Sequence, residues 1–107
     1  MKDVLTYEEF KEQDFSAAYY PFPDEAGAAI ARLVLKRLGK ENIICYFEGE
    51  DGEKFKLAVW WNKLESRAYR PRDSDLDMAE VEIGTEFDVS WDITHSGKAR
   101  FLAAEPV

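Results

Sequence analysis

The chain has 107 residues, which fits a single domain over 1–107 with a small hydrophobic core. Its hydrophobic content of 46% and aromatic content of 14% exclude a disordered chain, and its formal net charge of −8 opposes non-specific binding to nucleic-acid phosphates. No apolar run reaches the roughly 20 residues that a membrane helix needs, and the N-terminus lacks the apolar core of a signal peptide. The single cysteine, Cys45, cannot form a disulfide within the chain, so we expect a cytoplasmic protein without membrane contact.

Two helices are expected in the first part of the chain. A capping box from Thr6 to Glu9 predicts a short helix near 7–13. Asp24 is a suitable N-cap for a main helix near 25–38, and two basic residues followed by a glycine are typical of the end of such a helix. Apolar side chains recur along this segment at helical spacing, at Ile30, Leu33, Val34 and Leu38.

The segment between these helices reads AYYPFP over 18–23. Pro21 and Pro23 exclude a regular helix there and favour an extended path. Its three aromatic side chains are candidates for partner recognition. Packing over the sheet is the favoured interpretation, because the strands that follow are apolar on both faces and need a cover.

A β-hairpin is predicted over 42–61. Two apolar segments flank Asp51 and Gly52, a pair typical of a two-residue turn, and cross-strand partners then have residue numbers that sum to 103. Both faces are largely apolar in this register, so we expect the main helix over one face and the aromatic segment or a partner over the other. One face would carry Ile44, Tyr46, Phe55, Leu57, Val59 and Trp61, and the other Ile43, Cys45, Phe47, Ala58 and Trp60 with Lys54 and Lys56.

The rest of the chain is predicted to form strands at 66–70, 79–83 and 85–93, and a returning strand after a turn at 96–97. In the third of these segments apolar and polar residues alternate, as in a half-buried strand. The expected fold class is therefore α+β: one main helix plus a short N-terminal helix packed on an antiparallel sheet or small barrel of four to six strands. The hairpin's two apolar faces leave both a monomer and a homodimer open.

Residues 73–92 hold eight carboxylates and no Lys or Arg, which equals the whole net charge. Alternate residues on a strand lie about 6.6–6.8 Å apart, so carboxylates at this spacing form a line of negative charge, as a nucleic-acid strand does. Two interpretations stay open: a docking surface for a basic partner, or a solvated face that keeps the protein soluble. The candidate partner-binding residues are Asp73, Asp75, Asp77, Glu80, Glu82, Glu86, Asp88 and Asp92.

The same stretch contains the beginning of a calcium-loop pattern. Asp73, Asp75 and Asp77 match the first three ligand positions of a helix-loop-helix calcium site. The pattern then fails, because Met78 and Gly84 stand where it requires a glycine and a bidentate glutamate. We therefore expect no specific metal site and no cofactor.

Aromatic and basic residues are interleaved just before the acidic stretch. Such residues can stack on the bases of a single strand and neutralise its phosphates. Core packing of the tryptophans is the favoured interpretation, because the surrounding field is negative. The alternative function is a small barrel that binds single-stranded nucleic acid through Trp60, Lys63, Arg67, Tyr69, Arg70 and Arg72.

Catalysis has little support in the sequence. Cys45 and His95 are the single thiol and the single imidazole, and Cys45 stands mid-strand between apolar residues, which favours a buried, inert thiol. The sequence shows no glycine-rich phosphate loop and no nucleophile elbow. We expect no enzymatic activity and no catalytic residue.

In its size, its acidity and its lack of a catalytic constellation, the chain resembles the small acidic inhibitors encoded by phages and mobile elements, including anti-CRISPR proteins that block Cas9-type nucleases. The resemblance implies an inhibitor that competes with guide RNA or target DNA for a basic channel, and the part connected with that role is the stretch 73–92. We therefore expect a non-enzymatic interaction protein that binds a basic, nucleic-acid-handling protein and blocks its nucleic-acid site. No direct contact with nucleic acid is expected.

Overall fold

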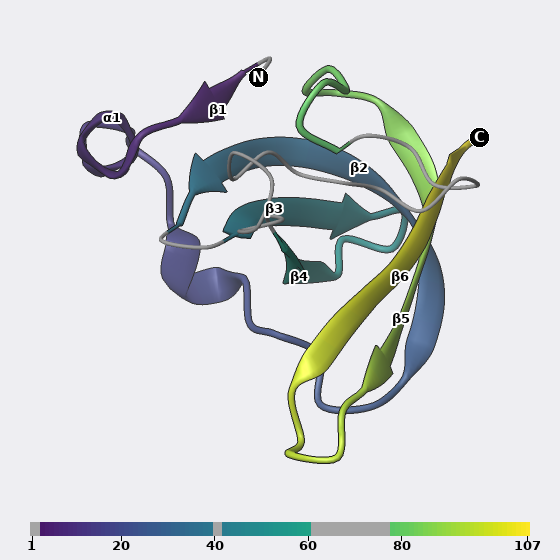
Figure 1. The fold of residues 1–107 in the computed structure, drawn as a ribbon. Coiled ribbons are helices and arrows are strands. Elements are labelled where there is room, and N and C mark those ends of the chain that lie inside the picture. The colour runs from purple at the N-terminus through teal and green to yellow at the C-terminus, as the bar shows by residue number, and fades with distance from the viewer. Residues whose placement is uncertain (1–2, 40–41, 61–77) are drawn as a thin grey trace.

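The computed structural model describes residues 3–39, 42–60 and 78–107. One six-stranded sheet dominates this part of the chain, with a single short helix and one 3-10 turn at its N-terminal side (Figure 1). The elements are β1 (Val4–Leu5), α1 (Tyr7–Lys11), the 3-10 turn Ala17–Tyr19, β2 (Gly27–Leu38), β3 (Asn42–Gly49), β4 (Lys54–Trp60), β5 (Glu86–Ile93) and β6 (Ala99–Pro106).

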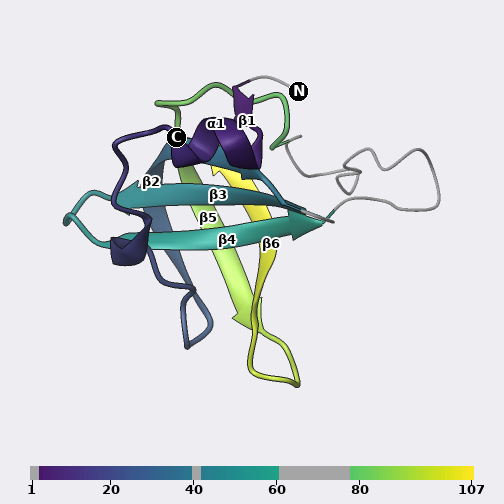
Figure 2. The ribbon, with the colours of Figure 1, turned by 90° about the vertical axis from the view of Figure 1, so that its left-hand side faces the viewer.

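The strands follow the order β4-β3-β2-β5-β6, and all these neighbours are antiparallel. The short strand β1 runs parallel to the C-terminal end of β2, beyond the part of β2 that pairs with β5. The sheet curls until its two outer strands, β4 and β6, contact each other. Figure 2 shows the result, with β3 and β4 in front of β5 and β6 and crossing them steeply. The main core lies inside this curl.

The expected main helix over 25–38 is wrong, and with it the α+β fold class, because these residues form β2 at the centre of a mostly-β structure. Ala31 and Leu33 alternate inward as in any strand, but the pairing with β3 shifts between Leu33 and Leu35. Val34 is the extra residue of this β-bulge. A bulge breaks the two-residue period, so the apolar positions acquire the three- and four-residue spacing that suggested a helix. Hydrogen bonding along both edges of β2 outweighs the helix propensity of its residues.

The short N-terminal helix is confirmed, and its capping box is complete. Glu9 N donates to the Thr6 hydroxyl at 3.2 Å, and Thr6 N donates to the Glu9 carboxylate at 3.0 Å. Because both ends of the box are made, one turn of helix is stable here despite its length of 5 residues.

The hairpin of β3 and β4 is present, but its predicted register is wrong by one residue. Ile43 pairs with Val59 and Phe47 with Phe55, so partner numbers sum to 102 rather than 103. The loop has three residues, since Gly49 N donates to Glu53 O at 2.7 Å, and Gly52 takes a φ of +84° that suits glycine. A shift of one residue moves side chains to the other face. The inner face is consequently apolar throughout, with Ile43, Cys45, Phe47, Phe55, Leu57 and Val59.

The outer face of the hairpin presents two large apolar side chains, Ile44 and Tyr46, which the N-terminal segment covers. The Phe10 ring of α1 stacks on Tyr46 with centroids 5.6 Å apart, and Tyr20 packs edge-on against the same ring at 5.7 Å. The packing interpretation of the aromatic segment therefore holds for Tyr20. Its neighbours Tyr19 and Phe22 remain 69% and 45% exposed.

The predicted strand at 79–83 is a turn instead, and the one predicted at 66–70 lies outside the described residues. The turn packs against the C-terminal half of β2. In this half the bulge at Val34 has shifted the alternation of side chains, so Lys36 lies on the core side of the sheet. Lys36 is fully buried, and its ammonium donates to the carbonyl oxygens of Met78, Ala79 and Val81 at 3.2, 3.3 and 2.6 Å. The turn and the central strand are thus joined by a buried, charge-assisted contact. Within the described ranges, no helix combines the length and apolar character required to cross a membrane.

Replacing Lys36 with Met should lower the free energy of unfolding by about 2–4 kcal/mol, because the buried carbonyls of the 78–81 turn lose their charged donor. The same change at the exposed Lys98 provides the control and should leave stability within about 0.5 kcal/mol of the wild type. Urea unfolding measures both. Amide exchange that accelerates more at 78–83 than in the core strands of K36M would locate the effect, whereas equal stability of K36M and K98M would contradict this role.

Candidate functional site

The outer face of β2, β5 and β6 brings together acids from distant parts of the chain. In one cross-strand row Arg32 of β2 lies between Glu48 of β3 and Glu86 of β5. In the next row Asp88 lies between Ile30 of β2 and Glu105 of β6. We define the acidic face as the carboxylates of these two rows together with Glu50 of the adjoining loop: Glu48, Glu50, Glu86, Asp88 and Glu105.

Charge on the acidic face is poorly compensated. Among the described residues two bases adjoin it: Arg32, whose guanidinium lies 3.9 Å from the Glu48 carboxylate, and Lys54 of β4, the cross-strand partner of Glu48. Asp88 and Glu105 stand directly opposite each other on antiparallel strands, a like-charge arrangement that destabilises a sheet. Ile30, 38% exposed, lies beside this pair and gives the face an apolar spot.

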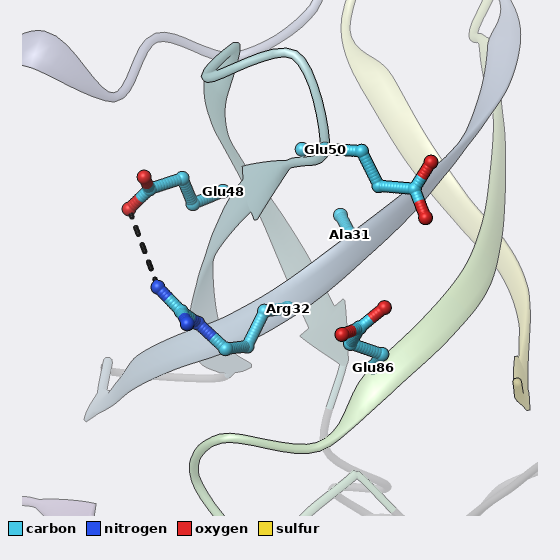
Figure 3. Close-up of a pocket in the computed structure, with 6 residues that line it drawn as sticks. Ala31, Arg32, Glu48, Glu50 and Glu86 are labelled. Carbon is cyan, nitrogen blue, oxygen red and sulfur yellow. Dashed lines mark ion pairs between the residues drawn. The ribbon is translucent and has the colours of Figure 1, made fainter.

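A pocket of about 320 Å³ opens between the first row and the β3–β4 loop. Figure 3 shows Glu48 and Arg32 paired on one side of Ala31, with the carboxylates of Glu50 and Glu86 on its other side. Of the charged groups that the structure describes in this lining, three are carboxylates and one is a guanidinium, so they carry a net negative charge. It suits the end of a cationic side chain, which would donate hydrogen bonds to Glu50 and Glu86.

The structure separates the acids that the sequence grouped. Glu86 and Asp88 are exposed on β5 as expected. Asp92 is on the same strand but forms a two-point pair with Arg100, with Nε 2.8 Å from Oδ1, and this pair lowers the pKa of its carboxyl. Asp92 therefore adds little free charge to the row. Glu80 and Glu82 are exposed in the 78–85 segment, while Asp73, Asp75 and Asp77 lie outside the described residues.

Sequence reasoning missed Glu48, Glu50 and Glu105 as members of the face. They belong to the β3–β4 hairpin and to β6, far from 73–92 in the chain, and only the strand order places them beside Glu86 and Asp88. The clean alternation of 85–93 was the available signal for which β5 residues face outward. The neighbours of these residues required the sheet topology.

The alternative nucleic-acid patch cannot be placed in the structure. Lys63, Arg67, Tyr69, Arg70 and Arg72 lie outside the described residues. Trp60 is the last residue of β4, but its side chain also lies outside the described part of the structure.

Cys45 and His95 occupy unlike environments. Cys45 is fully buried in the main core, and this burial raises the pKa of its thiol to about 12, despite the proximity of Lys36. His95 is exposed in the turn between β5 and β6. This arrangement gives no support to a Cys–His pair. Across 3–39, 42–60 and 78–107, no three His, Cys, Asp or Glu side chains are grouped so that they could hold a metal ion.

No protein family, curated protein or solved structure matches this chain. The function is therefore argued from the geometry and charge of the acidic face.

The Cys45 thiol should resist alkylation in the native protein. At pH 8 a thiol with its pKa raised to about 12 is almost wholly protonated, and its burial excludes the reagent as well. Modification by a maleimide should proceed only as fast as the protein unfolds, and 6 M guanidinium should make it immediate. Rapid labelling of the folded protein, followed by mass spectrometry, would contradict the buried placement of Cys45.

Changing Glu105 to Gln should raise the free energy of unfolding by about 0.2–1 kcal/mol, because it removes one member of the like-charge pair with Asp88. Glu12→Gln in the N-terminal segment is the matched control, since Glu12 is exposed and has no charged cross-strand neighbour among the described residues. Thermal unfolding at low salt measures the difference. Screening predicts that the gain shrinks at 0.5 M salt, and a gain that persists there would argue against a charge effect.

Proposed function

We propose that this chain is a non-enzymatic interaction protein that binds a basic, nucleic-acid-handling protein and blocks the site where that protein holds nucleic acid. The observation that carries the proposal is the acidic face. Five carboxylates from three separate parts of the chain (β3 with the loop that follows it, β5 and β6) converge there on one sheet. A Cas9-type nuclease is an example of such a partner, in keeping with the resemblance to small phage-encoded inhibitors.

The like-charge pair supports docking over simple solvation. Solubility can be supplied by acids anywhere on the surface, whereas Asp88 opposite Glu105 lowers the stability of the sheet itself. A basic partner would neutralise both carboxylates at once. Binding would thereby remove the repulsion that destabilises the free protein, which favours the complex.

The geometry also supports replacement of nucleic acid. Neighbouring strands lie about 4.8 Å apart and alternate residues along a strand about 6.7 Å apart. The carboxylates of Glu86, Asp88 and Glu105 therefore present closely spaced negative charge of the same sign as a nucleic-acid strand, although sparser than its one charge per roughly 3.4 Å. Long-range attraction of this kind speeds association, while Ile30 and its small neighbours can supply a buried apolar contact.

The test is a comparative capture experiment with two variants of equal charge. E86Q/D88N/E105Q neutralises three of the five carboxylates of the acidic face, and E8Q/E12Q/D14N neutralises three exposed acids of the N-terminal segment. Each changes the formal net charge from −8 to −5. We expect the wild type and the N-terminal variant to retain a basic, nucleic-acid-handling protein, identified by mass spectrometry, and the face variant to lose it. Added oligonucleotide should release that protein from the wild type.

Equal capture by all three proteins would refute the acidic face as the binding site. A low-salt titration of the isolated chain with labelled single strands addresses the alternative function. Tight, salt-sensitive binding of the strand would favour the nucleic-acid-binding barrel and contradict the proposal.

A further inference from the structure

A second pocket lies beneath residues 21–26, which we call the strap. The strap leads from the 3-10 turn into β2 and is fastened at both ends. Lys56 N of β4 donates to Pro21 O at 3.0 Å, and the indole Nε1 of Trp91 on β5 donates to Glu25 O at 2.8 Å. The pocket has a volume of about 400 Å³, within the range of about 300–1,000 Å³ typical of ligand sites.

The lining includes two aromatic side chains, Trp91 and Phe22, and Trp91 is held in place before any ligand binds. Trp91 is fixed by its hydrogen bond, by the Phe55 ring at a centroid distance of 5.0 Å, and by Gly27, where an added Cβ would lie 3.3 Å from the indole. Phe22 belongs to the strap and is 45% exposed. The Lys56 ammonium already lies 4.8 Å from the Phe22 ring centroid, so this ring engages a cation within the chain itself.

The polar lining restricts the ligand to one chemical class. Asp24, Glu25 and Glu53 line the pocket, and their ionised carboxylates only accept hydrogen bonds. Among the lining residues that the structure describes, the cationic one is Lys54, and its ammonium extends over the Tyr19 and Tyr20 rings, at 5.8 and 5.7 Å from their centroids. The indole N–H of Trp91 already donates its hydrogen bond to Glu25 O of the strap. A ligand must therefore bring positive charge and several donors.

We propose that this pocket binds an arginine side chain of the basic partner, an inference that rests on the proposed function for the partner's identity. A guanidinium is planar, carries five donors and stacks on aromatic rings, whereas an ammonium is a compact, strongly hydrated charge. Stacking on Trp91 or Phe22 would leave the guanidinium edge to the carboxylates of the strap and of Glu53. The acidic face attracts basic surfaces in general, and this pocket selects those with arginine.

The experiment compares hexa-arginine with hexa-lysine, two peptides of equal charge, at one ionic strength. The readout is the indole N–H resonance of Trp91 in ¹⁵N-labelled protein, assigned with the Trp91→Phe variant. We expect hexa-arginine to shift this resonance and to bind about five-fold more tightly than hexa-lysine. Equal affinities, or an unmoved indole resonance with both peptides, would overturn the proposal.

Two variants of equal charge separate the pocket from the acidic face. D24N/E53Q should lose the preference for arginine and bind hexa-arginine about ten-fold more weakly. E86Q/D88N should weaken both peptides alike and retain the preference. If the arginine preference survives in D24N/E53Q, the pocket is not its source and the proposal fails.

Failure of the pocket and failure of the proposed function give different results. An acidic face that is needed for capture of the basic partner, with no arginine preference in the wild type, leaves the proposed function standing and refutes the pocket. A Trp91-reported arginine preference without capture of a basic protein supports the pocket and refutes the proposed function.

Discussion

The buried ammonium of Lys36 joins the central strand β2 to the turn that leads into β5. A fully buried charge is tolerated only when polar groups surround it, and here the carbonyls of Met78, Ala79 and Val81 do so. These carbonyls precede β5 in the chain, and the same segment bonds to β2 again, since Gly84 N donates to Leu33 O and Leu33 N to Thr85 O. The start of β5 is thereby fixed against β2. The positions of Glu86 and Asp88 follow from that attachment.

The bulge at Val34 makes this arrangement possible. If β2 continued its regular alternation through Val34 without a bulge, Lys36 would point outward and Arg37 inward. With the bulge, the first half of β2 packs its side chains into the main core, and its second half contacts the 78–85 segment. The paired rows of the acidic face lie on the regular half of the strand, where pairing with β5 is uninterrupted. Glu48, Glu86 and Asp88 are consequently carried by strands that pair with a neighbour on both edges.

Features encoded by adjacent residues could be predicted from the sequence, and features that depend on distant partners could not. The capping box of α1, the alternation of β5 and the turn before β6 are local signals, and each matches the structure. The helix predicted over 25–38 failed because a bulged strand imitates helical spacing, and the bulge itself is defined by pairing with β3. The hairpin register failed because a loop of three residues was taken for one of two. The same reason explains why only part of the candidate site could be predicted. The alternation of β5 indicated that Glu86 and Asp88 face outward, whereas Glu48, Glu50 and Glu105 are placed beside them by the order of the strands in the sheet.

The curl of the sheet has a consequence for the shape of any partner. The side chains of the main core lie inside the curl, so the acidic face lies on its outer, convex side. Figures 1 and 2 show this curl in the ribbons of β2 and β5. A flat surface can touch a convex sheet only along a ridge, which buries little area and excludes little water. A trough matches it, because the walls of the trough reach the rows on either side of the ridge. Channels that hold a nucleic-acid strand are troughs of this kind, so curvature alone would favour an enclosed basic groove over an open basic surface.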